Sequence, residues 1–160
     1  MEMAIKVGLY SLICITGIPG TGKSTLCKML NEHGFRCTGL NHIARSAGVN
    51  NEDIVDIDGL SNIHIDFDIV ESHYSHLLNC NHVIILVDDN ETLIKRMEER
   101  GYSIEKINEN LDAQMADIIY YEALDRLPAN RIHIINERSR NIGDIYNEVI
   151  HIISRINNSK

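Results

Sequence analysis

The sequence contains no apolar run long enough to span a bilayer. Its first ten residues, MEMAIKVGLY, also lack the long apolar region and the small-residue cleavage site of a signal peptide. No Pro-, Gly- or Ser-rich linker divides the 160 residues. We therefore expect one domain over 1–160 with a sizeable core, in an intracellular protein that is cytoplasmic or, in a eukaryotic source, also nuclear.

Positive charge is scarce. The chain has 15 lysines and arginines against 23 aspartates and glutamates, which gives a formal net charge of -8 and a pI of about 5.4. Such a protein has little non-specific affinity for nucleic acid or anionic membrane, so we expect neither a DNA nor a membrane partner, whereas a basic protein would be attracted. Acidic residues gather at 52–58 and 88–91, where they form either contacts for such a partner or solvated loops.

The four cysteines are Cys14, Cys27, Cys37 and Cys80, and no two of them have the C-x-x-C spacing. Cys14 lies in an apolar run and Cys27 in a helical pattern. We therefore expect four reduced, partly buried thiols rather than disulfides or a zinc site.

Short runs rich in β-branched residues alternate with longer helical patterns. The expected strands cover 11–16, 35–39, 63–70, 82–88 and 131–136. The expected helices cover 23–33, 41–48, 90–100, 103–127 and 141–156, and Ser103 is the expected N-cap of the longest one. This alternation predicts an α/β fold with a parallel sheet flanked by helices on both faces.

The longest expected helix carries an apolar stripe. Residues Ile104, Ile107, Leu111, Met115 and Ile118 recur every three or four positions. Because this spacing places them on one face of a helix, we interpret the stripe as part of the core.

The segment GIPGTGKST, from Gly17 to Thr25, lies between the first expected strand and the first expected helix. It matches G-x-x-x-x-G-K-[ST], the phosphate-binding P-loop. Backbone N–H groups of such a loop, together with the positive end of the helix that follows, bind phosphate oxygens. The match in this context predicts nucleotide binding.

The residue types in the loop suit a nucleoside triphosphate. Gly20 and Gly22 permit positive φ and a close approach of the ligand, and Lys23 supplies a mobile positive charge. The Ser24 hydroxyl can ligate Mg²⁺. The expected ATP-binding residues of the loop are Gly20, Thr21, Gly22, Lys23, Ser24 and Thr25.

Three further stretches accompany the loop: LNHIAR at 40–45, DIVESHYSHLL at 68–78 and IKRMEERGYSIEKINENLDAQ at 94–114. Together they resemble the adenylate kinase isoenzyme 6 family, also called the Fap7 family, over most of residues 11–136. The resemblance implies the P-loop fold of nucleoside monophosphate kinases with a five-stranded parallel sheet, a monophosphate-binding region at about 40–62 and a short lid at about 99–110.

The resemblance also implies a function. Members of this family are expected to have adenylate kinase and ATPase activity, with ATP and Mg²⁺ as cofactors and AMP as the acceptor. They are further expected to act in the maturation of the small ribosomal subunit, with a basic small-subunit ribosomal protein as partner.

Glu71 and His73 follow the third expected strand, at the edge where P-loop enzymes place a carboxylate near Mg²⁺ and its waters. We expect Glu71, with Ser24, to hold the metal directly or through water. His73 could orient an attacking water or contact phosphate. For His76, three residues further along, packing on a helix surface is an equally good explanation.

Arg96 and Arg100 are four residues apart, so on a helix both project from one face. Guanidinium groups fixed there would stabilise the negative charge of a phosphoryl group in transfer. The resemblance places Arg100 in the lid against ATP and Arg45 on the acceptor phosphate. By composition alone, Arg96 and Arg100 could instead pair with Glu99 or nearby aspartates.

Two functions stay open at this point. The first is a kinase that transfers the γ-phosphoryl group of ATP to AMP or to water, with Lys23, Glu71, His73, Arg96 and Arg100 as catalytic residues. The second is an ATP-switched ribosome-assembly factor with little kinase activity. The intact arginines favour the kinase, whereas the region 46–62, shorter than in many relatives, favours the assembly factor.

Overall fold

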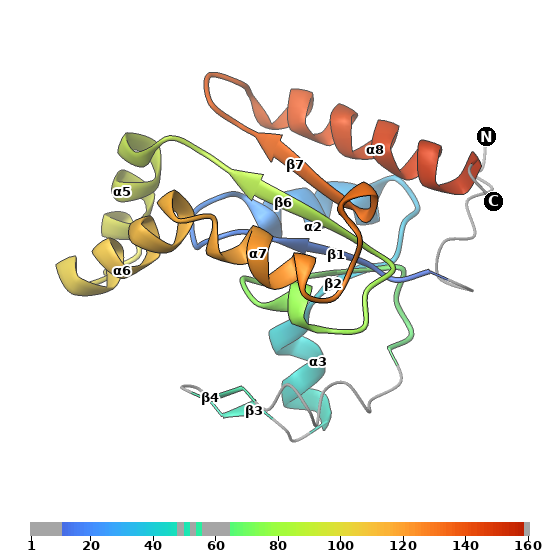
Figure 1. The fold of residues 1–160 in the computed structure, drawn as a ribbon, viewed down its shortest axis with the longest axis horizontal. Helices are drawn as coiled ribbons and strands as arrows, with labels where there is room; N and C mark the ends of the chain where they lie inside the picture. Colours follow the sequence, from blue (N-terminus) through green and yellow to red (C-terminus); the bar gives the residue numbers. More distant parts are fainter. Residues whose placement is uncertain (1–10, 48–49, 52–53, 56–64, 159–160) are drawn as a thin grey trace.

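The first strand in the described part of the chain lies in the middle of the sheet. The computed structural model describes residues 11–47, 50–51, 54–55 and 65–158, and within them five strands form a sheet in the order β2-β5-β1-β6-β7 (Figure 1). All neighbouring strands are parallel, which confirms the predicted sheet. The strand bounds are β1 (Ile13–Thr16), β2 (Cys37–Gly39), β5 (Ile69–Glu71), β6 (His82–Val87) and β7 (Ile132–Asn136).

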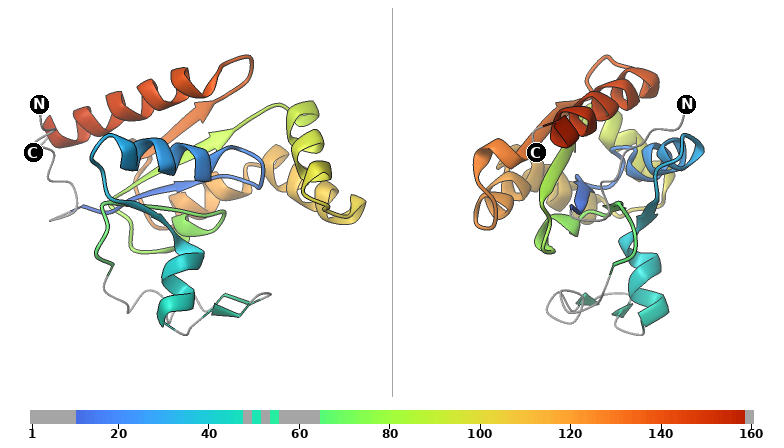
Figure 2. Two further views of the ribbon diagram at one scale, coloured as in Figure 1. Left: turned by 180° about the vertical axis from the view of Figure 1, so that it is seen from behind. Right: turned by 90° about the vertical axis from the view of Figure 1, so that its right-hand side faces the viewer.

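Helices cover both faces of this sheet (Figure 2). None of those in the described part of the chain has the length and apolarity of a membrane span. Outside the sheet, β3 (Asn50–Asn51) and β4 (Ile54–Val55) form an antiparallel pair. The helices are α2 (Lys23–Glu32), α3 (Leu40–Ala47), α5 (Asn90–Glu99), α6 (Ile104–Met115), α7 (Ile118–Leu124) and α8 (Ile142–Asn158), with 3-10 turns η1 (Ser75–Leu77) and η2 (Ala129–Arg131).

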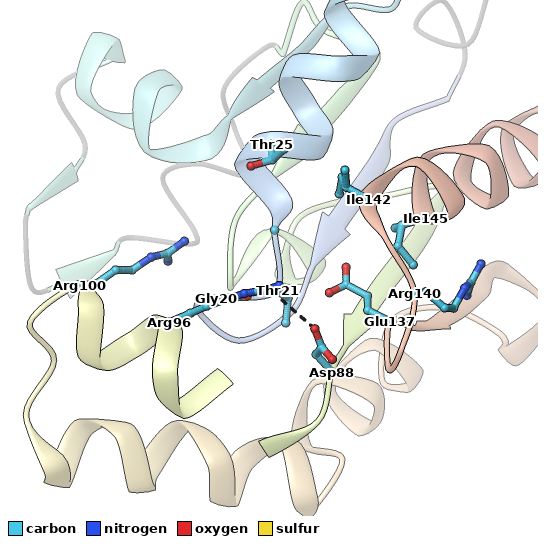
Figure 3. Close-up of a pocket in the computed structure, with 11 residues that line it drawn as sticks. Gly20, Thr21, Thr25, Asp88, Arg96, Arg100, Glu137, Arg140, Ile142 and Ile145 are labelled. Atoms are coloured by element: carbon cyan, nitrogen blue, oxygen red, sulfur yellow. Dashed lines mark hydrogen bonds and ion pairs between the residues drawn. The ribbon is translucent and has the colours of Figure 1, made fainter. Parts of the chain in front are cut away.

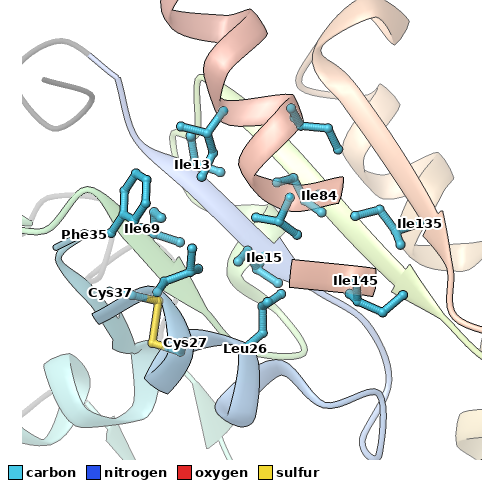
Figure 4. Packing of buried hydrophobic residues seen from close by; sticks show 14 of the residues in the cluster. Ile13, Ile15, Leu26, Cys27, Phe35, Cys37, Ile69, Ile84, Ile135 and Ile145 are labelled. Carbon is cyan, nitrogen blue, oxygen red and sulfur yellow. A yellow bond between two sulfur atoms is a disulfide. The ribbon is translucent and has the colours of Figure 1, made fainter. Parts of the chain in front are cut away.

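The alternation of side chains along β1 divides the core into two layers. Ile13 and Ile15 point toward α2 and α8, where they pack with residues such as Leu26 and Ile145 (Figure 4). Cys14 points to the opposite face, which is covered by α3, α7 and the segment around η1. Because β1 is buried on both faces, the packing of the core holds in place the end of the strand from which the P-loop begins.

The expected helix over 103–127 is wrong in one respect: it is two helices. Ser103 caps α6 as predicted, since its hydroxyl accepts a hydrogen bond from the N–H of Lys106 at 3.1 Å. The helix ends at Met115, and Asp117, with a left-handed φ of 54°, starts α7 in a new direction.

This break also corrects the predicted core stripe. Ile107 and Leu111 are buried, as expected, against Ile18 of the P-loop and two residues of α5. The other three are exposed, with Ile104 at 77%, Met115 at 69% and Ile118 at 43% relative accessibility. A stripe holds its face only along a continuous helix, so the prediction fails at the ends of α6 and beyond the break.

The expectation of four reduced thiols is also wrong. A disulfide joins Cys14 of β1 to Cys80 before β6, and another joins Cys27 of α2 to Cys37 of β2. The partners are 66 and 10 residues apart in sequence. The fold brings the cysteines of each pair together, and their spacing in the sequence does not indicate the pairing.

The expected acceptor region is described only in part. Of residues 40–62, the structure describes α3, β3 and β4, and this hairpin was not predicted because strands of two residues show no alternation. The expected strand at 63–70 begins later, as β5 at Ile69, and residues 63–64 lie outside the described part.

Candidate active site

The P-loop connects β1 to α2, and its shape depends on glycine. Gly17 has a φ of 150°, and a Cβ there would lie 2.6 Å from the carbonyl oxygen of Leu86. Gly22, with a φ of 85°, is the N-cap residue of α2, and no side chain caps this helix. The first N–H groups of α2 are thus available for an anion, as expected of a P-loop.

Lys23 is buried at the base of the loop. Its ammonium group donates to the carbonyl oxygens of Gly17 (2.8 Å) and Ile18 (3.0 Å) and to Oγ1 of Thr21 (3.3 Å). Burial lowers its pKa from 10.5 to about 8, against the opposing effect of Glu71 and with the added repulsion of Arg100. The loop's own oxygens therefore hold the ammonium group, and phosphate oxygens could replace them.

Two cavities flank the loop. The first, of about 310 Å³, lies toward α8 (Figure 3) and is lined by Gly20, Thr21, Gly22, Thr25, Asp88, Arg96, Arg100, Glu137, Arg140, Ile142 and Ile145. The second, of about 240 Å³, lies toward β2 and β5 and is lined by Pro19, Gly20, Gly22, Lys23, Ser24, Gly39, Leu40, Asn41, Glu71, Ser72, His73, Arg100 and Tyr102. Arg100 and two loop glycines line both, so a group held over the loop can face either cavity.

Helix α5 carries the two predicted arginines to the loop. Nη1 of Arg96 donates to the carbonyl oxygen of Gly20 at 2.7 Å and lies 3.5 Å from Oδ2 of Asp88. Arg100, the C-cap residue of α5, is exposed. Both line the first cavity, in agreement with the shared face predicted from their spacing. Arg96 does pair with an aspartate, which was the alternative left open by composition.

Glu71 ends β5 beside the start of α2. Its Oε2 accepts a hydrogen bond from the Ser24 hydroxyl at 3.3 Å, and burial raises its pKa although Lys23 and Ser24 oppose the rise. One hydroxyl and one carboxylate suit Mg²⁺, which takes few protein ligands and completes its shell with phosphate oxygens and water. Among the described residues there is no group of three or more His, Cys, Asp or Glu side chains that could hold a metal ion.

His73 and His76 have different surroundings. His73 lines the second cavity. Its side chain is exposed, but the cavity wall partly desolvates the ring, and this together with the Lys23 charge lowers its pKa. His76 is buried, with Nδ1 3.0 Å from Oγ1 of Thr16 and Nε2 2.8 Å from Oε1 of Glu122. His76 thus links β1 to α7 rather than packing on a helix surface.

Arg45, which was predicted to bind the acceptor phosphate, does not lie at the two cavities beside the P-loop. It is exposed in the last turn of α3 and lines neither of the two cavities. The neighbouring positions 48–49 lie outside the described part of the chain.

Asp88 and Glu137 were not predicted as site residues. Both line the first cavity directly after a strand, Asp88 after β6 and Glu137 after β7. The rule that places Glu71 at the carboxyl edge of the sheet applies to them as well, so their position after apolar strands was a usable signal.

Comparison with known proteins identifies relatives over nearly the whole chain. A sequence model of the family described as "AAA domain" matches residues 13–117. The protein "Putative adenylate kinase" of Thermoplasma acidophilum is 50% identical over 145 residues, covering 89% of this chain and 97% of that protein. Those of the same name from Thermoplasma volcanium and Archaeoglobus fulgidus are 47% and 36% identical, covering 93% and 89% of this chain and 98% and 82% of those proteins.

Solved structures share the fold. A gluconokinase from Sinorhizobium meliloti superposes with a TM-score of 0.59 at 12% identity, covering 93% of this chain and 94% of that one. At so low an identity the likeness concerns the arrangement of sheet and helices alone.

Proposed function

The chain belongs to the family of archaeal proteins named "Putative adenylate kinase", and from this premise we propose that it transfers the γ-phosphoryl group of ATP to AMP, giving two ADP. The observation that carries the proposal is the pair of cavities on the two sides of one P-loop, with Arg100 on the wall of both. A kinase must hold a donor and an acceptor at the same time, whereas a simple hydrolase needs one nucleotide site.

In this proposal the donor occupies the first cavity and the acceptor the second. The ammonium group of Lys23 leaves the carbonyl oxygens of Gly17 and Ile18 and binds the β- and γ-phosphates, as in other P-loop enzymes. Arg100 and Arg96 stabilise the negative charge of the transferring group.

Magnesium neutralises phosphate charge when it is bound with ATP. Ser24 and Glu71 would hold it, directly or through water, since their oxygens already share a hydrogen bond at the edge of the second cavity. His73 faces the same cavity and would orient the acceptor or a water molecule. Arg45 would reach the acceptor phosphate only if α3 moved toward the loop, a closure that is common in kinases.

We also propose ATP hydrolysis as a side reaction. The lid expected at about 99–110 comprises Arg100, Tyr102 and the first turns of α6, and so short a segment excludes water poorly. Some ADP and inorganic phosphate should therefore form without an acceptor.

A role in assembling the small ribosomal subunit, through a basic ribosomal protein, is a finer proposal supported by the net charge of -8. Two of the acidic residues at 88–91 have structural contacts, since Asp88 pairs with Arg96 and Asp89 caps α5. Glu91 is exposed and is the acidic residue of this stretch that could contact a basic protein. Much of the 52–58 stretch lies outside the described residues. Failure of purified small-subunit proteins to bind without nucleotide, with ADP and with a non-hydrolysable ATP analogue, at two salt concentrations, would eliminate this role.

The kinase proposal is tested by turnover. ADP formation is measured with ATP alone and then with AMP, CMP, GMP or UMP added, and AMP is expected to give the largest stimulation. Lys23→Met should abolish turnover, whereas Lys28→Met, on the exposed side of the same helix, should not. If no monophosphate stimulates the wild-type protein, the transfer reaction is excluded.

A further inference from the structure

A carboxyl pair lies in the wall of the first cavity, where the proposed function would place a highly negative nucleotide. Asp88 follows β6 and Glu137 follows β7, directly after the paired residues Val87 and Asn136, and both side chains line this cavity. Both are buried: the Asp88 side chain is 6% exposed and Glu137 is 6% exposed. Two ionised carboxylates in such a place would repel each other and the phosphates.

Asp88 already has hydrogen-bond and ion-pair partners outside the pair. Its Oδ2 lies 3.5 Å from Nη1 of Arg96, and its Oδ1 accepts a hydrogen bond from the N–H of Asp89 at 2.7 Å. Both oxygens of Asp88 thus already have a donor, which leaves Glu137 as the carboxyl group of the pair that can hold a proton and donate it to Asp88.

One carboxyl oxygen of Glu137 is a hydrogen-bond acceptor that the described residues leave unpaired. Within the described part of the chain, Oε2 of Glu137 is buried without a hydrogen-bond partner, although the residue lines the cavity. Its backbone is fixed, since its N–H donates to the carbonyl oxygen of Val87 at 2.7 Å. In Figure 3 its carboxyl group points toward the P-loop, whereas Arg140 points away from it and pairs with Glu148 at 2.7 Å.

We propose that Glu137 binds the donor nucleotide as a neutral carboxylic acid: it shares one proton with Asp88, and its Oε2 accepts a hydrogen bond from an amino or hydroxyl group of the nucleotide. This inference rests on the proposed function and adds a binding residue to it. Phosphate oxygens offer no hydrogen to an acceptor, so the partner is either a ribose hydroxyl or the amino group of adenine.

The electrostatics agree with this assignment. Burial, and then the charge of Asp88 and the hydrogen bond to it, raise the pKa of Glu137 to about 8, although Arg96 and Lys23 oppose the rise. The negative charge of a bound nucleotide would raise the pKa of Glu137 further. In the free protein Glu137 ionises as the pH passes about 8, so the nucleotide then has to bind together with a proton, and its affinity falls.

The test measures the dissociation constant of ATP from pH 6.5 to 9 in the wild-type protein and in Glu137→Gln, which keeps an acceptor oxygen and cannot ionise. The Lys23 ammonium, whose pKa is also about 8, weakens binding in the same direction in both proteins. Because the Glu137 charge helps to raise the Lys23 pKa, Lys23 loses its proton more readily in the variant, which works against the expected difference. A larger rise in the wild-type protein therefore comes from Glu137. We expect equal affinity within about twofold at pH 6.5. Between pH 7 and 9 the dissociation constant should rise about five- to tenfold more in the wild-type protein than in the variant.

Two further measurements complete the test. Calorimetry in two buffers of different ionisation enthalpy counts the protons taken up on ATP binding by the wild-type protein and by Glu137→Gln, and the wild-type protein should take up more. ATP analogues that lack the 2′-hydroxyl, the 3′-hydroxyl or the adenine amino group identify the partner. One of them should bind to the wild-type protein about three- to tenfold more weakly than ATP does. In Glu137→Met, which has no acceptor oxygen, the same analogue and ATP should bind with equal affinity.

Several results would overturn the inference. Identical pH profiles in the wild type and Glu137→Gln, or no difference in proton uptake, would mean that Glu137 does not titrate with binding. A loss of more than tenfold in Glu137→Gln at pH 6.5 would mean that the ionised carboxylate is needed, as for a cation. If the wild-type protein binds no ATP at any pH, the proposed function itself fails, and that result is distinct from the others.

Discussion

Replacing Lys23 by methionine should weaken nucleotide binding strongly at little cost to the fold. Lys23 is 9% exposed, and its pKa falls from 10.5 to about 8 chiefly because of burial. That fall means that the charged side chain weakens the folded state by about 3 kcal/mol relative to an unburied lysine. Methionine has a similar length and no charge, so it relieves this cost.

An opposing effect has a similar size. Methionine cannot donate to the carbonyl oxygens of Gly17 and Ile18, which Lys23 binds at 2.8 and 3.0 Å. Leaving such groups without a donor costs about 1–3 kcal/mol. We therefore expect the free energy of unfolding of Lys23→Met at pH 7 to lie within about 2 kcal/mol of the wild-type value. ATP affinity should fall about a hundredfold, because charge-assisted bonds to phosphate are lost.

The two effects separate with pH. Between pH 8 and 10.5 the unfolded wild-type chain still carries the Lys23 proton and the folded protein does not, so stability gains from this side chain as the pH rises. From pH 8 to 10 the wild type should gain about 2–3 kcal/mol relative to Lys23→Met. Urea unfolding followed by circular dichroism at pH 7, 8, 9 and 10 measures this, with Lys28→Met as the control. A difference that stays constant with pH would refute the argument from burial.

Two further predictions concern the second cavity and the lid. Glu71→Gln and His73→Ala should leave ATP affinity within about threefold of the wild type and slow turnover at least tenfold, because both side chains face the acceptor side of the loop; wild-type rates in both variants would make these residues structural. Ser103→Ala should lower the free energy of unfolding by about 1 kcal/mol because the hydroxyl caps α6, whereas Asn108→Ala, on the exposed side of that helix, should not lower it.

The order of strands and helices could be predicted because the signal is local. The run expected as a strand at 82–88 is apolar from Val83 to Val87, as expected of a strand buried on both faces, and β6 covers His82–Val87. The P-loop could also be predicted from the sequence, since its glycines and Lys23 stand at a fixed spacing. The order of the strands within the sheet was not predicted, because periodicity along the chain does not report which strands are neighbours.

Features that depend on contacts distant in sequence could not be predicted in this way. The Cys14–Cys80 disulfide follows from the position of β1 next to β6, and the role of Asp88 and Glu137 follows from the adjacency of β6 and β7. The break before α7 depends on the left-handed conformation of a single residue, Asp117, which hydrophobic periodicity does not report.

The central claim is transfer of a phosphoryl group between two nucleotides, and the fate of the γ-phosphate tests it most directly. ATP labelled in the γ-phosphate is incubated with the protein and unlabelled AMP, and the products are separated within the first turnovers. We predict that most of the label appears in ADP and a minor part in inorganic phosphate, and that the labelled ADP disappears when AMP is omitted. Label found in inorganic phosphate alone, at the same rate with and without AMP, would contradict the account.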